Sequence, residues 1–326
     1  MKTSTSEDII KYLKAKGPSA AKNLSDHFGI SRQALFKHHL PKLQKRGQIA
    51  KVGRPPKVFY YIPDKEAIEK TSQVSLSVKK IIDERYLIIT PSGKIKEGLD
   101  GFEYWCIKNK LDIPKTADEY IKTLEKYDHF KKNGLIDGMV KMKQTFKKVY
   151  VDKLFYLDFY SLERFGKTKL GQMLLYAKQS QDKKLIKRLS ENIAISINSL
   201  VKKYKINGVG FIPPTVKREV QFINELRKNL KLPIRKINLV KLKTQVAVPQ
   251  KTLSKLNDRI ENASTSIIVD DYEKYNNILL IDDAVGSGAT INETARQIRN
   301  KKMCKGKIIS LSITGSYKGF DVISEV

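Results

Sequence analysis

The sequence predicts an α/β protein with a doubly wound parallel sheet in its C-terminal part, a mainly helical connector and a small N-terminal helical domain. Three observations predict this arrangement. Apolar runs such as 278-ILLI-281 alternate with longer amphipathic stretches in the C-terminal part, which is typical of parallel strands joined by helices. The first 62 residues contain several helix start and stop signals. The length of 326 residues allows two or three domains, and we expect them at 1–62, 63–150 and 151–326.

The charge of the chain indicates an anionic partner. The sequence contains 63 Lys and Arg against 34 Asp and Glu, a formal net charge of +29. The first 62 residues are the most basic part, with 13 Lys and Arg against 3 Asp and Glu. The electrostatic field of so many positive charges attracts polyanions, among them nucleic acids and phosphorylated ligands. Lysine used for solubility explains the later segments equally well, but it explains the N-terminal excess less easily.

Composition excludes several classes of protein. The hydrophobic share of 40% and aromatic share of 9% support globular cores, so a disordered chain is not expected. The apolar runs are far shorter than the roughly 20 residues of a membrane-spanning helix, and the N-terminus has no apolar signal core. The two cysteines, Cys106 and Cys304, cannot form a disulfide framework or a four-cysteine zinc site. We therefore expect a cytoplasmic protein that makes no membrane contact.

The first 62 residues carry the spacing of a helix-turn-helix. A first helix is expected to begin near Ser4 and to end at Gly17-Pro18, and a second is expected to begin at Ser19. Gly29 then supplies a tight turn, and Ser31 caps a third helix that runs through Leu43. Pro41 lies inside this third helix, where it is expected to bend it.

Two short β-type runs, 49-IAKV-52 and 58-VFYYI-62, follow and are joined by 53-GRPPK-57. With the three helices, this arrangement resembles the winged helix-turn-helix domains of transcription regulators. The resemblance implies DNA binding, although winged helices also serve as protein-protein modules. The residues that it implies as DNA contacts are Ser31, Arg32, Gln33 and Lys37 on the third helix, Arg54 and Lys57 on the wing, and Lys42, Lys45 and Arg46 toward phosphates. Gly53-Arg54-Pro55 also resembles an AT-hook, in which an arginine enters a narrow A·T-rich minor groove.

Residues 63–150 show no catalytic pattern. Their turn signals and charged helical stretches predict a mainly helical connector. The aromatic residues at helix-compatible spacing are expected to form its core: Phe102, Tyr104, Trp105, Tyr120, Tyr127 and Phe130. The four histidines lack cysteine or acidic partners at the spacing of metal ligands, so no zinc site is expected.

The most informative segment is 276-NNILLIDDAVGSGATINETARQI-298. An apolar strand leads into Asp282 and Asp283, then into a loop with Gly286, Ser287 and Gly288, and then into Thr290 and a helix. Backbone N–H groups at the start of a helix form a cradle for anions, and glycines let the backbone approach a phosphate closely. The two acids would lie at the carboxyl end of a buried parallel strand, where open α/β sheets bind ligands. The segment contains neither a Walker loop nor a dinucleotide fingerprint.

This segment resembles the phosphoribosyl pyrophosphate signature of type I phosphoribosyltransferases, which are glycosyltransferases of nucleotide metabolism. The family usually has a Thr where Gly286 stands. Upstream, 208-GVGFIPPTVKREVQFINELRKNL-230 and 249-PQKTLSKLNDRIENA-263 resemble the ComF-type subgroup, and 170-LGQMLLYAKQSQDKKLIKRLSENIA-194 resembles its first helices. The subgroup often begins with a cysteine zinc ribbon, which this chain lacks. We expect parallel strands near 208–212, 237–241, 278–281 and 308–313.

The resemblance implies a role for each part of the C-terminal site. The 5-phosphate of phosphoribosyl pyrophosphate would lie against Ala284, Val285, Gly286, Ser287, Gly288, Ala289 and Thr290, and its ribose hydroxyls against Asp282 and Asp283. The pyrophosphate would lie against Pro214, Thr215, Lys217 and Arg218. Mg²⁺ would bind with the ligand near the two acids, with no ligand set supplied by the protein alone. Lys243 stands where the subgroup often has an Arg, and with Lys251 it would close over the leaving group.

Two classes of function remain open at this stage. In the first, the protein is a phosphoribosyltransferase that transfers or removes a phosphoribosyl group, with the N-terminal domain bound to DNA. Similar domains occur as accessory effectors of retron anti-phage systems, which favours an enzyme of antiviral defence. In the second, the protein is a non-catalytic transcription regulator that senses phosphoribosyl pyrophosphate or a nucleotide, as the resemblance to purine-type repressors implies. The sequence does not decide whether the chain forms a homo-oligomer.

Overall fold

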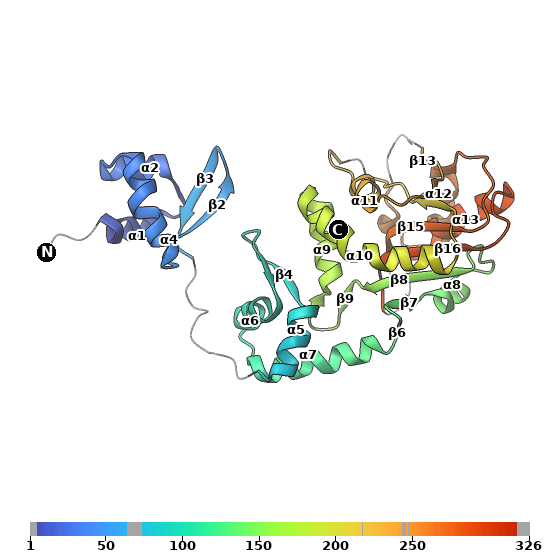
Figure 1. The fold of residues 1–326 in the computed structure, drawn as a ribbon, viewed down its shortest axis with the longest axis horizontal. Helices are drawn as coiled ribbons and strands as arrows, with labels where there is room; N and C mark the ends of the chain where they lie inside the picture. Colours follow the sequence, from blue (N-terminus) through green and yellow to red (C-terminus); the bar gives the residue numbers. More distant parts are fainter. Residues whose placement is uncertain (1–4, 64–73, 217, 243–245, 247, 318–326) are drawn as a thin grey trace. The chain divides into compact units, whose positions relative to one another are not determined.

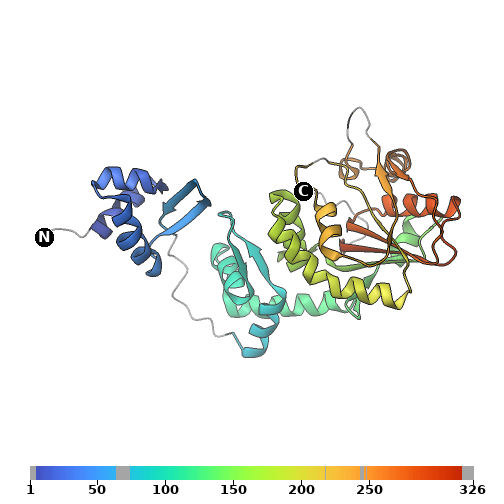
Figure 2. The same cartoon turned by 45° about the horizontal axis from the view of Figure 1, so that its top comes forward.

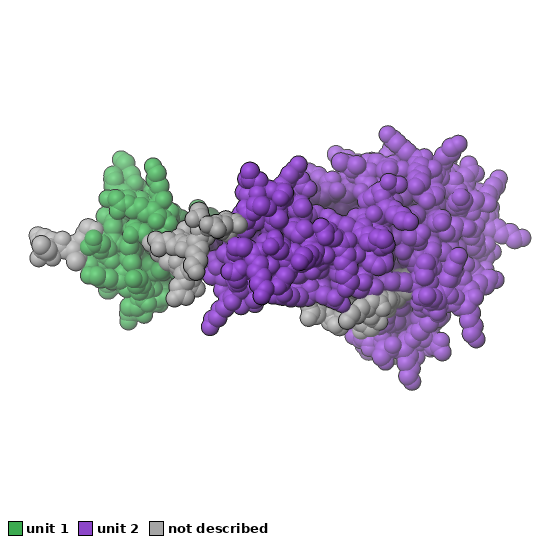
Figure 3. Space-filling view, turned by 90° about the horizontal axis from the view of Figure 1, so that it is seen from below, with its two compact units in different colours: residues 1–72, 91–93 green, residues 73–90, 94–326 purple. Residues whose placement is uncertain are grey.

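A computed structural model of the chain describes residues 5–63, 74–216, 218–242, 246 and 248–317. The chain divides into two compact units, residues 1–72 with 91–93 and residues 73–90 with 94–326 (Figure 3). The first unit has a small apolar core of its own around Ile9, Leu24 and Leu35. The second holds two larger cores, one on each face of a sheet.

The first unit packs helices against a three-stranded antiparallel sheet of order β1-β3-β2 (Figure 1). Its core residues recur at helical spacing, so one face of each main helix is apolar. Its elements are α1 (Thr5–Lys16), β1 (Ser19–Ala20), α2 (Ala21–Phe28), α3 (Arg32–Ala34), the π-helical turn η1 (Leu35–His39), α4 (Leu40–Lys45), β2 (Ala50–Arg54) and β3 (Lys57–Tyr61).

The second helix begins later than the sequence predicts. Ser19 and Ala20 do not start it but form β1, because they pair with Tyr60 and Phe59 of β3. The prediction for the following turn is confirmed: Gly29 has a left-handed backbone with φ of 59°.

The third helix begins as predicted and continues through a π-helical turn. The Oγ atom of Ser31 accepts a hydrogen bond from the backbone N–H of Ala34 at 3.1 Å. Further along, the N–H of Leu40 bonds to the carbonyl oxygen of Leu35, five residues earlier. A π turn widens the helix locally, and proline has no N–H to give and crowds the preceding turn. The widened turn therefore accommodates Pro41 without ending the helix.

The hairpin of β2 and β3 depends on Gly53. Its φ is 94°, and a Cβ atom there would lie 2.2 Å from the carbonyl oxygen of Lys57 on the paired strand. No other residue fits at this place without displacing the backbone. The strands run over 50–54 and 57–61, within two residues of the prediction.

The second unit is built on a seven-stranded, mostly parallel sheet of order β12-β11-β15-β16-β8-β7-β6. The first five strands in this order run parallel, and β7 and β6 are antiparallel. Its elements before residue 150 are α5 (Leu76–Arg85), β4 (Leu87–Ile89), β5 (Ile95–Glu97), α6 (Gly98–Lys108), α7 (Ile113–Asp128), β6 (Lys131–Lys132), β7 (Leu135–Asp137) and α8 (Met139–Thr145). The later elements are β8 (Lys153–Phe159), β9 (Ser161–Leu162), β10 (Gly166–Lys167), α9 (Lys169–Ser180), α10 (Lys183–Lys203), β11 (Gly208–Phe211), α11 (Phe222–Leu230), β12 (Arg235–Lys236), β13 (Leu239–Lys241), η2 (Gln250–Thr252), α12 (Leu256–Ser266), β14 (Ile267–Val269), β15 (Ile278–Val285), α13 (Ala289–Asn300) and β16 (Ile308–Gly315).

Helices cover both faces of the sheet, as a doubly wound α/β fold requires (Figures 1 and 2). Along β15, Ile278 and Leu280 belong to the core beneath α13, whereas Leu279 and Ile281 belong to the core beneath α9, α10 and α11. This alternation follows from the two-residue period of a strand. Burial on both faces explains why the sequence of β15 reads as an unbroken apolar run.

Residues 74–150 contain more β structure than a mainly helical connector. The pair β4 and β5 forms a hairpin between helices, and β6 and β7 extend the main sheet next to β8. Phe102, Tyr120 and Tyr127 are buried as predicted, whereas Phe130 is 46% exposed. The buried aromatic side chains continue into the later part of the unit, since Tyr127 packs against Phe159 with ring centroids 5.1 Å apart. These residues therefore share a core with the α/β part of the chain.

One predicted parallel strand is wrong. Instead of joining the main sheet, residues 239–241 form β13, which pairs antiparallel with β14. The neighbouring pair Arg235–Lys236 takes the edge position as β12, where it pairs with β11. Strands near 208–212, 278–281 and 308–313 are confirmed as parallel members of the sheet.

Candidate functional site

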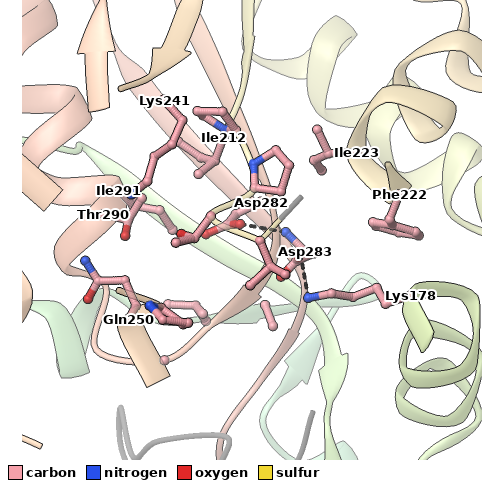
Figure 4. Close-up of a pocket in the computed structure, with 18 of the residues that line it drawn as sticks. Lys178, Ile212, Phe222, Ile223, Lys241, Gln250, Asp282, Asp283, Thr290 and Ile291 are labelled. Carbon is pink, nitrogen blue, oxygen red and sulfur yellow. Dashed lines mark hydrogen bonds and ion pairs between the residues drawn. The ribbon is translucent and has the colours of Figure 1, made fainter. Parts of the chain in front are cut away.

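A pocket of about 260 Å³ lies at the carboxyl ends of β11 and β15 (Figure 4). Segments that are distant in the sequence line it, among them the end of α9, the loop after β11 with the start of α11, residues 282–291, and Lys241, Gln250 and Arg259. Ligands of open α/β sheets bind at this edge, because the loops that follow parallel strands meet there. The structure thus provides a cavity at the edge of the sheet where the sequence predicts a bound ligand.

Asp282 and Asp283 form the floor of this pocket, and their side chains leave β15 on opposite sides. Asp283 points toward α9, whereas Asp282 is in register with Ser312 of β16 and points to the other face. The Oδ1 atom of Asp282 accepts a hydrogen bond from the backbone N–H of Asp283 at 2.8 Å. Burial and the negative charge of Asp283 raise the pKa of Asp282 to about 8. The two adjacent acids therefore carry less than two negative charges near neutral pH.

Asp283 has a cationic partner that the sequence analysis missed. The Nζ atom of Lys178 lies 2.8 Å from Oδ2 of Asp283, and both side chains are partly shielded from water. Lys178 stands in the last turn of α9, about a hundred residues before the acid pair. The sequence signal for it is weak, because a lysine near a helix C-terminus is ordinarily a solvated residue that complements the helix dipole.

The loop that the sequence predicts to cradle an anion leads directly into α13. Gly288 precedes α13 with φ of 79°, and a Cβ atom there would lie 2.6 Å from the Sδ atom of Met142. The Oγ atom of Ser287 accepts a hydrogen bond from the N–H of Ala289 at 3.3 Å. The first turn of an α-helix leaves its N–H groups without partners in the helix, and the helix dipole favours an anion there. The N-terminus of α13 therefore offers donors to an anion in the pocket.

The proline-rich loop after β11 is held against the end of α9. The Nη1 atom of Arg218 donates a hydrogen bond to the backbone oxygen of Lys178 at 2.5 Å. Two residues on, the N–H of Val220 donates to Oε1 of Gln181 at 2.7 Å. Pro214, Thr215 and Arg218 all line the pocket, so the loop lies beside the acid pair.

Two further cations, Lys241 and Arg259, line the pocket. Burial lowers the pKa of each. Arg259 is only 5% exposed, and its Nε atom donates to the carbonyl oxygen of Leu253 at 2.7 Å. Within the described part of the chain, its Nη2 atom and the Oε1 atom of Gln250 are buried and have no hydrogen-bond partner. Burying polar atoms without hydrogen bonds costs free energy, unless water or a ligand bonds to them.

The structure brings most of the predicted site residues into this one pocket. Asp282, Asp283, all seven residues of the loop 284–290, Pro214, Thr215 and Arg218 line it. Lys217 and Lys243 lie outside the described residues, as does the side chain of Lys251. Sequence reasoning missed Lys178. It gave no individual role to Lys241, Gln250 and Arg259, although the stretch with Gln250 and Arg259 contributed to the family resemblance.

The predicted DNA contacts of the first unit form an exposed face. Ser31, Arg32, Gln33 and Lys37 are exposed on the third helix, and Lys57 is exposed at the start of β3. Within the described part of this unit, Arg32, Lys37 and Lys57 form no ion pair with a carboxylate, so their charge is free to act on a partner. Arg54 lies in β2, but its side chain is not among those described.

A search of protein-family models finds no match to this sequence, and a search of curated proteins finds none either. Across the residues that the structure describes, no helix has the length and apolar character to span a bilayer. In the same residues, no three His, Cys, Asp or Glu side chains gather in a way that could hold a metal ion by themselves. Any divalent cation at the acid pair would therefore need further ligands from water or from a bound substrate.

Proposed function

We propose that the second unit binds 5-phosphoribosyl 1-pyrophosphate together with Mg²⁺ and transfers or removes its phosphoribosyl group. The observation that carries this proposal is the meeting of three features in one pocket: two adjacent acids, the N-terminus of α13 with its glycine loop, and the proline-rich loop with Arg218. The ligand has three matching parts, namely ribose hydroxyls, a 5-phosphate and a pyrophosphate. Each feature of the pocket suits one of them.

The proposal assigns the parts of the ligand as follows. The 5-phosphate accepts hydrogen bonds from the loop 284–290 and lies on the positive end of the α13 dipole. Carboxylates accept hydrogen bonds from hydroxyl groups, so Asp282 and Asp283 hold the ribose. Arg218 faces the pyrophosphate, with Lys217 as a further cation of the same loop.

The acid pair fits Mg²⁺ in this role. Mg²⁺ prefers oxygen ligands and usually binds through one or two carboxylates together with substrate phosphates and water. Asp282 and Asp283 supply such oxygens next to the predicted pyrophosphate position. When bound, the ion would neutralise negative charge on the leaving pyrophosphate.

The reaction requires the protein to position the reacting groups and does not require a covalent bond to the protein. The bond between C1 of the ribose and the pyrophosphate oxygen breaks, pyrophosphate leaves with the bonding electrons, and the attacking nucleophile bonds to C1 and gives up its proton. The pocket would hold the ribose at one end and the anionic leaving group at the other, which lowers the barrier by fixed orientation and charge stabilisation. Lys241 and Arg259 add positive charge to the lining of the pocket.

Isothermal titration and a pyrophosphate-release assay test this function together. Phosphoribosyl pyrophosphate should bind the full-length protein in the presence of Mg²⁺, and Asp282→Asn with Asp283→Asn should lose most of that affinity. Slow release of pyrophosphate should be measurable with a pool of bases and nucleotides as acceptors. Arg227→Met, on the exposed side of α11, serves as a matched control because it removes a cation outside the pocket. Equal affinities in wild type and the double variant would contradict the proposal.

We further infer that the first unit is a winged helix-turn-helix that binds DNA, which leaves a second function for the whole chain. The exposed cations of its third helix and of its hairpin support this inference. In this alternative, the protein is a transcription regulator that senses the ligand without turnover. A pyrophosphate-release rate equal to that without protein, combined with a ligand-dependent change in DNA affinity, would favour the regulator over the enzyme.

A further inference from the structure

The ion pair between Lys178 and Asp283 lies inside the proposed ligand pocket. It is formed by two side chains of the protein and needs no ligand. Its two side chains come from α9 and from the end of β15, and both line the pocket (Figure 4). The Nζ to Oδ2 distance is 2.8 Å, and each side chain is 23% exposed. An ion pair shielded to this degree is weakened less by salt than a pair on the open surface.

A pocket that binds a polyanion faces an electrostatic conflict when its floor holds two carboxylates. Phosphate groups and carboxylates repel one another, and low-dielectric surroundings strengthen the repulsion. In the ligand-free protein the conflict is reduced at Asp283, because Lys178 compensates its charge.

Lys178 also contacts the loop that is proposed to hold the pyrophosphate. Its backbone oxygen accepts the 2.5 Å hydrogen bond from Arg218, so two cations meet at the last turn of α9. Nearby, Gln181 fixes the same loop through the N–H of Val220. The end of α9 is therefore joined to the acid pair through the side chain of Lys178 and to the anion-binding loop through its backbone.

We propose that Lys178 is a built-in counter-ion of the acid pair, which compensates Asp283 in the ligand-free protein and gives way to a divalent cation when the diphosphate ligand binds. This inference rests on the proposed function, because it assumes an anionic ligand in this pocket. It assigns Lys178 a positioning role. An ordinary structural ion pair between α9 and β15 would give the same distance, so the test must separate the two.

The opposite effects that the proposal predicts for an anion and for a cation provide that separation. Inorganic pyrophosphate without divalent cation, measured by isothermal titration, is the anionic probe, and Mn²⁺ alone, measured by electron paramagnetic resonance, is the cationic probe. In Lys178→Met, pyrophosphate should bind about tenfold more weakly and Mn²⁺ about threefold or more tightly, because Asp283 loses its compensating charge. In Lys178→Arg, both affinities should stay close to those of wild type.

Asp283→Asn gives an independent test that does not need the Lys178 variant to fold. It frees a cation in the pocket, so pyrophosphate without divalent cation should bind about tenfold more tightly, although the same variant should bind phosphoribosyl pyrophosphate with Mg²⁺ more weakly. The double variant Lys178→Met with Asp283→Asn should return pyrophosphate affinity to near that of wild type, since the two charges are removed together. Lys187→Met, which removes an exposed ion pair with Glu191 on α10, should change neither affinity.

The outcomes distinguish this inference from the proposed function. If the affinities for pyrophosphate and Mn²⁺ fall together in Lys178→Met, or if neither changes, the ion pair is structural and the counter-ion role is wrong. Failure of the wild type to bind pyrophosphate or phosphoribosyl pyrophosphate would instead overturn the proposed function. Even then the Mn²⁺ measurement decides the role of Lys178, because tighter Mn²⁺ binding in Lys178→Met supports it and unchanged binding overturns it.

Discussion

The backbone N–H of Asp283 donates a hydrogen bond to the side chain of Asp282 at 2.8 Å, so the first acid of the pair accepts a bond from the second. This bond favours the charged form of Asp282, but burial and the adjacent charge of Asp283 outweigh it and raise the pKa of Asp282 to about 8. A proton on Asp282 is therefore expected near neutral pH. Ligands that need both carboxylates ionised must displace it.

The first prediction concerns the pH dependence of ligand binding. The affinity for phosphoribosyl pyrophosphate with Mg²⁺ should rise as pH increases through the region of 8, with net release of a proton, because binding favours ionised Asp282. Titration calorimetry in buffers of different ionisation enthalpy measures the released proton. Asp282→Asn should remove this release, and a proton count that is the same in wild type and variant would contradict the assignment.

The second prediction follows from the same group and concerns stability. The folded state binds a proton on Asp282 between the ordinary carboxyl pKa and about 8, whereas the unfolded state does not. The contribution of this group to the free energy of unfolding is thus fully present at low pH and decreases as pH rises across that window. Thermal unfolding should show Asp282→Asn gaining stability relative to wild type between pH 5 and pH 9. A constant difference across this range would mean that Asp282 titrates normally.

Much of the site was predictable because it lies in one continuous segment. The apolar run of β15, the two acids and the glycine loop follow one another without a gap, and local rules place them at the end of a strand and the start of a helix. The end of β11 was predictable in the same way. Lys178 was not, because its role depends on where α9 lies against the sheet, and nothing near residue 178 in the sequence specifies that contact.

The errors in the fold also have physical causes. Residues 237–241 have the composition of a central strand, yet only tertiary pairing decides whether they join β11 or β14. The second helix was expected to begin at Ser19, but Ser19 pairs with Tyr60 as a strand residue of the sheet in the first unit. The π-helical turn before Pro41 could not be predicted from the sequence. A proline indicates that the helix is distorted, but it does not indicate the kind of distortion.

The third prediction compares two glycines of the loop 284–290. A Cβ atom at Gly286 would meet nothing within 4 Å, whereas one at Gly288 would collide with Met142, and Gly288 also has a positive φ. Gly286→Thr should therefore keep the stability of the protein, and its added hydroxyl should tighten phosphoribosyl pyrophosphate binding by about tenfold. Gly288→Ala should lower the free energy of unfolding by about 1–3 kcal/mol and weaken binding. Urea unfolding and titration calorimetry measure both, and equal behaviour of the two variants would contradict the proposed loop geometry.

The fourth prediction concerns the buried guanidinium of Arg259. Because its Nη2 atom has no partner in the described part of the chain, its charge costs free energy in the ligand-free protein. Arg259→Met should keep or raise the melting temperature and should weaken binding of phosphoribosyl pyrophosphate by at least about tenfold. Arg227→Met is the control for removal of one cation. A large loss of stability in Arg259→Met with unchanged ligand affinity would show that Arg259 only anchors the stretch around Leu253.

The last prediction concerns the first unit and the salt dependence of DNA binding. Each phosphate contact that a cation makes contributes about 0.9 to the slope of log affinity against log salt. If Arg32 and Lys37 contact DNA, Arg32→Ala with Lys37→Ala should weaken binding of duplex DNA by the full-length protein. The slope should fall by up to about 2 when both contacts are to phosphates and less when one is to a base edge.

Lys202→Ala, an exposed cation on α10 of the second unit, should leave affinity and slope unchanged. Arg54→Ala should weaken binding mainly on A·T-rich duplexes, because a narrow minor groove attracts an arginine side chain most strongly. Electrophoretic mobility shifts over a series of salt concentrations measure all three variants. Should the Arg32 and Lys37 variant bind DNA with the wild-type slope and affinity, the exposed face of the third helix is not the DNA contact, and a protein partner becomes the better explanation for this unit.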